Sequence, residues 1–97
     1  MNTEQVIELV NESMLDSLQD AKNLLYRRKI PQVAHKLDID RHRWYEIATD
    51  VYKCDDGFIG VTGISYLYSE NMTYRDCDIH CFAEEYKEVV TVTYKKK

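Results

Sequence analysis

The spacing of apolar residues divides the chain into a helical part, residues 1–42, and a β part, residues 43–97, of one domain. In the first 29 residues apolar side chains recur every three or four positions without Gly or Pro, which predicts one long helix. Thr3 is its expected N-cap, and Pro31 ends it because the residue before a proline is pushed out of helical conformation. We expect residues 31–37 to form a short second helix.

From residue 43 onward, Thr, Val, Ile and Tyr are concentrated between turn signals, which is typical of strands. Asp55-Asp56-Gly57 predicts a hairpin, and Gly60 and Gly63 indicate a bulge or a close approach within the strand that follows it. The expected strands are residues 43–54, 58–68 and 76–94, and a break at residues 83–85 would divide the last into two. The predicted fold is α+β, with the long N-terminal helix packed on a small antiparallel sheet of three to four strands.

Composition supports a single folded domain of 97 residues, since 44% are hydrophobic and 31% charged, with only three Gly and one Pro. No apolar run approaches the ~18 residues of a membrane span, and residues 1–5 lack the start of a signal peptide. We therefore expect a protein of the bacterial cytoplasm that does not bind membranes.

The cysteines do not indicate a metal site or a catalytic centre. Cys54, Cys77, His80 and Cys81 have the ligand types of a Cys3His zinc site, but in an extended segment His80 would face away from both Cys77 and Cys81. We expect free, buried thiols and no metal or cofactor. Without a recognisable catalytic motif or a phosphate-binding glycine loop, the chain is not expected to be an enzyme.

The net charge of −4 conceals a strong alternation along the chain. Residues 1–20 contain five acids and no base, at an unbroken interval of four: Glu4, Glu8, Glu12, Asp16 and Asp20. Like charges at this spacing destabilise a helix by about 0.2–0.5 kcal/mol per pair, so the stripe does not serve helix stability. It is either an ordinary solvated face or a surface that resembles a phosphate backbone and binds a groove lined with Lys and Arg.

Two other groups of residues are candidates for binding. A basic and aromatic set, in which cations can hold phosphates and an aromatic ring can stack on a base, comprises Arg27, Arg28, Lys29, Arg41, Arg43 and Trp44. Tyrosines are enriched in protein interfaces, and three of the eight cluster around one expected loop: Tyr66, Tyr68 and Tyr74. Helix capping by the basic residues and packing of the tyrosines in the sheet are the structural alternatives.

Part of the β region resembles short accessory proteins of bacterial mobile elements. The resemblance rests on Arg43-Trp44-Tyr45, Val51-Tyr52-Lys53, residues 56–61 and residues 91–95, and it carries no ligand-binding residues. In size and charge the chain is also similar to the anti-CRISPR proteins, with which phages and plasmids inhibit host defence.

These observations lead to one expected function and one alternative. We expect a non-catalytic inhibitor that binds a bacterial defence nuclease, such as a CRISPR-Cas ribonucleoprotein, and mimics nucleic acid with the acidic stripe. The alternative is a small regulatory protein that binds nucleic acid through the basic and aromatic set. A second apolar stripe on the first helix, Ile7, Met14 and Ala21, further predicts a homodimer.

Overall fold

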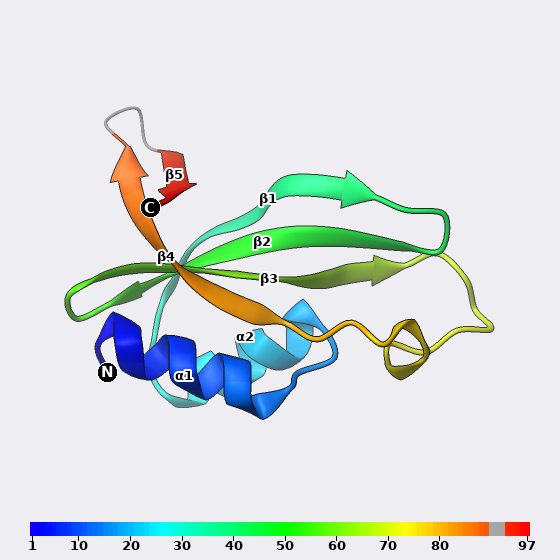
Figure 1. Ribbon diagram of the computed structural model, residues 1–97, viewed down its shortest axis with the longest axis horizontal. Coiled ribbons are helices and arrows are strands. Elements are labelled where there is room, and N and C mark those ends of the chain that lie inside the picture. Colours follow the sequence, from blue (N-terminus) through cyan, green and yellow to red (C-terminus); the bar gives the residue numbers. More distant parts are fainter. Residues whose placement is uncertain (90–92) are drawn as a thin grey trace.

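The structure, a computed structural model, describes residues 1–89 and 93–97 (Figure 1). Two helices lie on one face of a five-stranded antiparallel sheet, in which the strands follow one another in chain order. The elements are α1 (Thr3–Ser13), α2 (Leu18–Arg27), β1 (Gln32–Arg41), β2 (Tyr45–Cys54), β3 (Gly57–Leu67), the short 3-10 helix η1 (Arg75–Cys77), β4 (Phe82–Val89) and β5 (Thr93–Lys96). The predicted α+β class is confirmed.

The predicted long helix is wrong, because the chain turns back after α1 and both helices lie under the sheet (Figure 1). Helix α1 is capped by Asn2, not Thr3: the Asn2 side chain accepts from Gln5 N–H and the Gln5 side chain accepts from Asn2 N–H. It ends at Met14, which is left-handed with φ 49°. Ser17 then caps α2 by accepting from the backbone N–H of Asp20 at 3.2 Å. This reversal lets two short apolar stripes cover the sheet side by side.

The side chain of Asn11 fixes α1 to the sheet. Its Oδ1 accepts from the backbone N–H of Ala83 at 2.7 Å, and its Nδ2 donates to the Ala83 carbonyl at 3.4 Å. Four residues after Asn11, the Leu15 carbonyl accepts from the backbone N–H of Cys81 at 2.8 Å. Polar groups at the start of β4 are thereby satisfied by the helical part, as buried backbone requires.

The second helix predicted for residues 31–37 is also wrong, since this segment belongs to β1. The strand pairs with β2 through three register shifts, and Lys36 and Asp38 within it are left-handed. β2 is buried on both faces and therefore needs a hydrogen-bonding partner on each side, which β1 and β3 provide. The β part thus begins at Gln32 instead of residue 43, and the sheet has five strands instead of three or four.

The hairpin between β2 and β3 is confirmed, with Cys54 paired to Gly57 across a two-residue turn. Gly57 does not have a positive φ, so the reason given for the glycine does not apply. The last expected strand, residues 76–94, begins only at Phe82, because residues 75–77 form η1 and Asp78 is left-handed. Its continuation through residues 90–92 lies outside the described residues.

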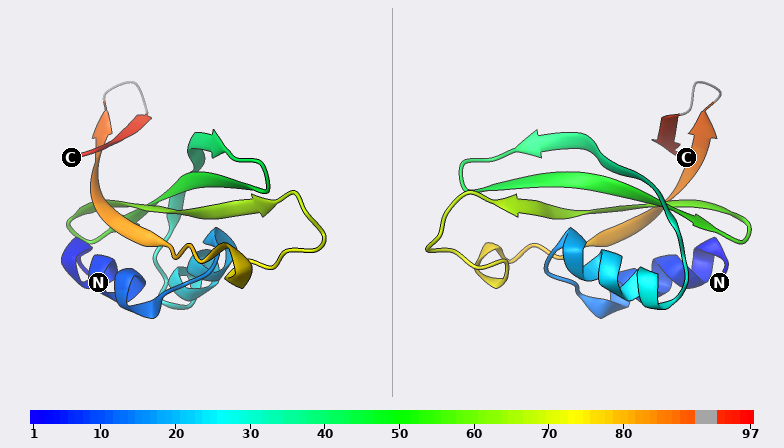
Figure 2. Two further views of the ribbon diagram at one scale, coloured as in Figure 1. Left: turned by 45° about the vertical axis from the view of Figure 1, so that its right-hand side comes forward. Right: turned by 180° about the vertical axis from the view of Figure 1, so that it is seen from behind.

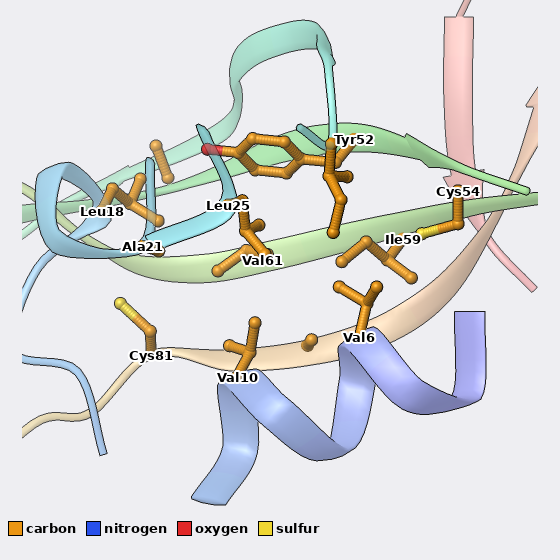
Figure 3. Close-up of a cluster of buried hydrophobic side chains, with 13 residues drawn as sticks. Val6, Val10, Leu18, Ala21, Leu25, Tyr52, Cys54, Ile59, Val61 and Cys81 are labelled. Carbon is orange, nitrogen blue, oxygen red and sulfur yellow. The ribbon is translucent and has the colours of Figure 1, made fainter. Parts of the chain in front are cut away.

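The main core lies between the helices and the sheet (Figure 3). Its buried side chains include Val6 and Val10 from α1, Leu25 from α2, and Ile59 and Val61 from β3. The sheet is curled (Figure 2), and Val51, Ile64 and Tyr86 are buried on the face that points away from the helices.

Both glycines of β3 mark close approaches, as expected. A Cβ at Gly60 would lie 2.4 Å from the ring of Tyr86, and one at Gly63 would lie 2.4 Å from the Cys81 sulfur. The irregularity in the pairing of β2 with β3 falls elsewhere, between Glu46 and Ile47.

Candidate functional site

Carboxylates from three elements meet around a surface hollow of about 540 Å³, the acidic hollow: Glu4 and Glu8 of α1, Asp56 of the β2–β3 turn and Glu85 of β4. The other lining residues are Asn2, Thr3 and Ile7, so among the described residues no basic side chain lines it. Asp56 is fixed there because its Oδ1 accepts from the backbone N–H of Thr3 at 2.7 Å. A negative charge at this position also suits the N-terminus of α1.

The charges of the acidic hollow are only partly compensated. Glu85 binds Lys97 with 2.6 Å between Oε1 and Nζ. Glu4 and Glu8 form no ion pair with any residue that the structure describes. The hollow therefore offers at least two unpaired carboxylates to a cationic group.

The remaining members of the predicted acidic stripe do not continue this surface. Glu12 is exposed near the end of α1, Asp16 lies in the turn between the helices, and Asp20 is in the first turn of α2. The Oδ1 of Asp16 faces His80 Nδ1 at 3.5 Å. Because the chain reverses direction between α1 and α2, an unbroken ribbon of five carboxylates does not form.

The basic and aromatic set is split between the two ends of the molecule, whose long axis measures 41 Å (Figure 1). Arg27 is the last residue of α2, and Arg28 and Lys29 follow it at the end where β2 finishes. Arg28 and Lys29 share a hollow with Lys53. Arg41, Arg43 and Trp44 lie at the β1–β2 turn, at the opposite end. These six residues therefore do not form one surface for a nucleic-acid segment.

The structure brings Trp44 together with two of the predicted tyrosines, at what we call the aromatic end: Arg43, Trp44, Tyr66 and Tyr68. The backbone N–H of Tyr68 donates to the Trp44 carbonyl at 2.8 Å, and the Tyr66 and Tyr68 rings are 5.4 Å apart. The Arg43 guanidinium lies 4.7 Å from the centre of the Trp44 ring. Trp44 is 45% exposed and Tyr66 54%, so both rings are available to a partner. Tyr74 is half-buried at the start of η1 and lies outside this group.

A buried carboxylate that the sequence analysis missed, Glu46, holds this end in place. It accepts from Ser65 Oγ at 2.7 Å and from the Tyr68 hydroxyl at 3.3 Å, and the Nε of Arg41 is 3.5 Å away. The Ser65 hydrogen bond above all, with Lys36, Tyr68 and Arg41, lowers the pKa of Glu46 against the opposing effect of burial. In the sequence, Glu46 is a charged residue within a predicted strand of largely apolar character, and this pattern could have identified it. The same holds for Asp50.

The cysteines occupy separate places. Cys54 and Cys81 are buried among apolar side chains, and burial raises the pKa of the first to about 11 and of the second to about 12. Cys77 lies in η1, so the alternation argued for residues 76–81 does not apply, since this segment is not a strand. Among residues 1–89 and 93–97, no group of three or more His, Cys, Asp and Glu side chains is arranged to hold a metal.

The second apolar stripe does not give the support expected for a homodimer. Ala21 is fully buried and Ile7 packs against the core, so the sheet itself covers them. Met14 alone of the three is exposed, at the left-handed end of α1. The homodimer therefore remains a prediction, without support from the apolar stripe that suggested it.

Comparisons of the chain with models of protein families, with curated proteins and with solved structures gave no match. None of the helices in the described part of the chain is long and apolar enough to cross a membrane.

Proposed function

We propose that the protein is a non-catalytic inhibitor, carried by a phage or another mobile element, that binds a bacterial defence nuclease such as a CRISPR-Cas effector. The acidic hollow docks onto the basic channel in which that nuclease holds nucleic acid. One observation carries the proposal: α1, the β2–β3 turn and β4 place four carboxylates around a concave surface whose lining, in the part of the chain that the structure describes, contains no basic side chain.

The shape of the hollow suits an inserted Lys or Arg side chain better than it suits a flat surface. Glu4 and Glu8 are one helical turn apart, and Asp56 and Glu85 approach from the sheet. Exposed ion pairs contribute at most about 1 kcal/mol each, so the affinity must come from several carboxylates acting together. The main effect of such a field is faster association and orientation of a basic partner, which weaken as salt rises.

The test is charge reversal within the hollow against a matched reversal outside it. Glu8→Lys is compared with Glu70→Lys, which makes the same change in net charge at an exposed position between β3 and η1. Cleavage by purified CRISPR-Cas effectors is titrated with each variant, and pull-downs measure binding. We expect Glu8→Lys to weaken inhibition about tenfold or more, a loss of ~1.4 kcal/mol, and Glu70→Lys to leave it unchanged. Equal effects of the two variants would contradict docking through the hollow.

The aromatic end supports a second candidate function, the binding of single-stranded nucleic acid. Arg43 over Trp44, next to two exposed tyrosines, offers stacking surfaces and a cation at one place. Trp44 is the only tryptophan, so its fluorescence reports directly on base stacking. This function predicts quenching by single-stranded DNA at low salt that Arg43→Ala reduces; unchanged fluorescence at low salt would exclude it.

A further inference from the structure

A polar cleft of about 240 Å³ opens at the start of α2, away from the acidic hollow; two of its lining residues, Lys36 and Ser65, also contact Glu46 at the aromatic end. Its walls come from three elements: Leu18 and Lys22 of α2, His35 and Lys36 of β1, and Asp50 of β2. Gln19, Gln32 and Ser65 complete the lining. The cleft therefore combines hydrogen-bond donors and acceptors with one apolar side chain.

Asp50 forms the buried base of this cleft. Its residue is 6% exposed, and its Oδ1 accepts from the backbone N–H of Lys36 at 3.0 Å. No described residue donates a hydrogen bond to its Oδ2. A carboxylate has several acceptor positions, so Asp50 retains capacity for a donor that enters from the cleft.

The Tyr52 hydroxyl lies on the same side of the sheet, two residues along β2 from Asp50. Tyr52 is 1% exposed, and its hydroxyl has no hydrogen-bond partner among the described residues. In Figure 3 the hydroxyl points away from Cys54 and toward the side of Leu18, which lines the cleft; Tyr52 itself is not a lining residue, so its hydroxyl lies behind the cleft surface. A buried hydroxyl without a hydrogen-bond partner is unfavourable, so a donor or acceptor that reached this hydroxyl would stabilise the protein.

We propose that this cleft binds a small neutral polyhydroxylated molecule, such as a free sugar or polyol, through Asp50, and that the Tyr52 hydroxyl behind the lining joins the same hydrogen-bond network. The charges of the lining nearly balance, because Lys36 pairs with Glu46 at 3.9 Å and Lys22 opposes Asp50, so the cleft has no excess charge that would favour an ionic ligand. Hydroxyl groups both donate to Asp50 and accept from the lysines. The volume corresponds to about eight waters at ~30 Å³ each; because covalently bonded atoms lie closer together than waters do, a ligand of about a dozen heavy atoms fits. Ligands of that size are expected to bind with a Kd of about 1 mM.

The experiment titrates the full chain with glucose and with three linear probes of equal length: sorbitol, gluconate and glucamine. Backbone amide shifts in two-dimensional NMR are the readout, with the Lys36 and Ser65 amides as reporters of the cleft. We expect saturable shifts there with neutral glucose or sorbitol, and affinities at least about fivefold lower for gluconate and glucamine than for sorbitol. No saturable shift with either neutral probe up to about 50 mM, roughly fifty times the expected Kd, would overturn the proposal and leave the cleft to water.

Two variants locate the binding. Tyr52→Phe removes the unpartnered hydroxyl and is expected to fold normally, with an unchanged or higher melting temperature, while weakening the neutral probe about fivefold, the value of one hydrogen bond of ~1 kcal/mol. Tyr86→Phe is the matched control, because Tyr86 is buried on the opposite face of the sheet. Asp50→Asn is expected to weaken the neutral probe and to remove the discrimination against gluconate. Equal binding by the wild type and Tyr52→Phe would show that the hydroxyl takes no part and would overturn the assignment.

Discussion

Replacing Gly63 by Ala is expected to destabilise the protein, because the space beside this glycine is filled by Cys81. The added Cβ would lie 2.4 Å from the Cys81 sulfur and 3.4 Å from its Cα. Cys81 is buried, and its backbone N–H is bound to the Leu15 carbonyl, so the strand cannot simply move away.

The magnitude follows from two opposed effects. Overpacking a core position costs about 1–3 kcal/mol, whereas loss of glycine's freedom in the unfolded chain returns about 0.4–1 kcal/mol. A net decrease of about 1–2 kcal/mol in the free energy of unfolding is expected, which for a domain of this size lowers the melting temperature by roughly 4–16 °C.

Urea unfolding followed by circular dichroism measures this change. Gly57→Ala is the control, since its Cβ would lie at an ordinary contact distance of 3.4 Å from the Thr3 side chain. Introduced into a Cys81→Ala background, Gly63→Ala is expected to have little effect, because the clashing sulfur is absent. If the destabilisation were the same in both backgrounds, Cys81 would not be the residue that requires glycine, and the packing described here would be refuted.

Three further predictions concern pH, docking and capping. The pKa of Glu46 is lowered in the folded protein, so the stability that this carboxylate contributes is present above its ordinary pKa of 4.5 and is lost as pH falls through the folded-state pKa. Glu46→Gln removes this titration. The variant is therefore expected to show a shallower decrease in the free energy of unfolding at acidic pH, measured by urea titrations at a series of pH values. Asn11→Ala removes both hydrogen bonds to Ala83 and is expected to cost about 1–3 kcal/mol in the same assay, while unchanged stability would deny that this contact fixes α1. Ser17→Ala should cost about 1 kcal/mol and lower the melting temperature, whereas Ser17→Asp should preserve the cap and the wild-type value.

The sequence is most informative where a pattern is local. Apolar positions at helical spacing are the ones that reach the core, as Val6, Val10 and Leu25 show. The break between the helices also had a signal, because Ser17 followed by Asp20 is a helix start inside the apolar pattern. β1 had no such signal: left-handed Lys36 and Asp38 interrupt the two-residue alternation by which a strand is recognised.

The candidate surfaces depend on contacts between distant segments and so were only partly predictable. Helical spacing correctly placed Glu4 and Glu8 on an exposed face. Their association with Asp56 and Glu85 results from strand pairing, which no local pattern contains. The aromatic end likewise joins Trp44 and Tyr68 through the β2–β3 register, while the helical hairpin dispersed Asp16 and Asp20.

The irregularity of β1 has a consequence for how the protein behaves at high concentration. β1 is an edge strand, and an edge normally presents unpaired amides and carbonyls that invite the strands of other chains. Left-handed Lys36 and Asp38 and three register shifts interrupt that row of groups, and two of the interrupting residues are charged. A strand from a second molecule would find no regular ladder to extend and would have to place its backbone against charge. The β1 edge is thereby protected against sheet-to-sheet aggregation, and a partner that approaches this edge is left to bind through side chains rather than by adding a strand.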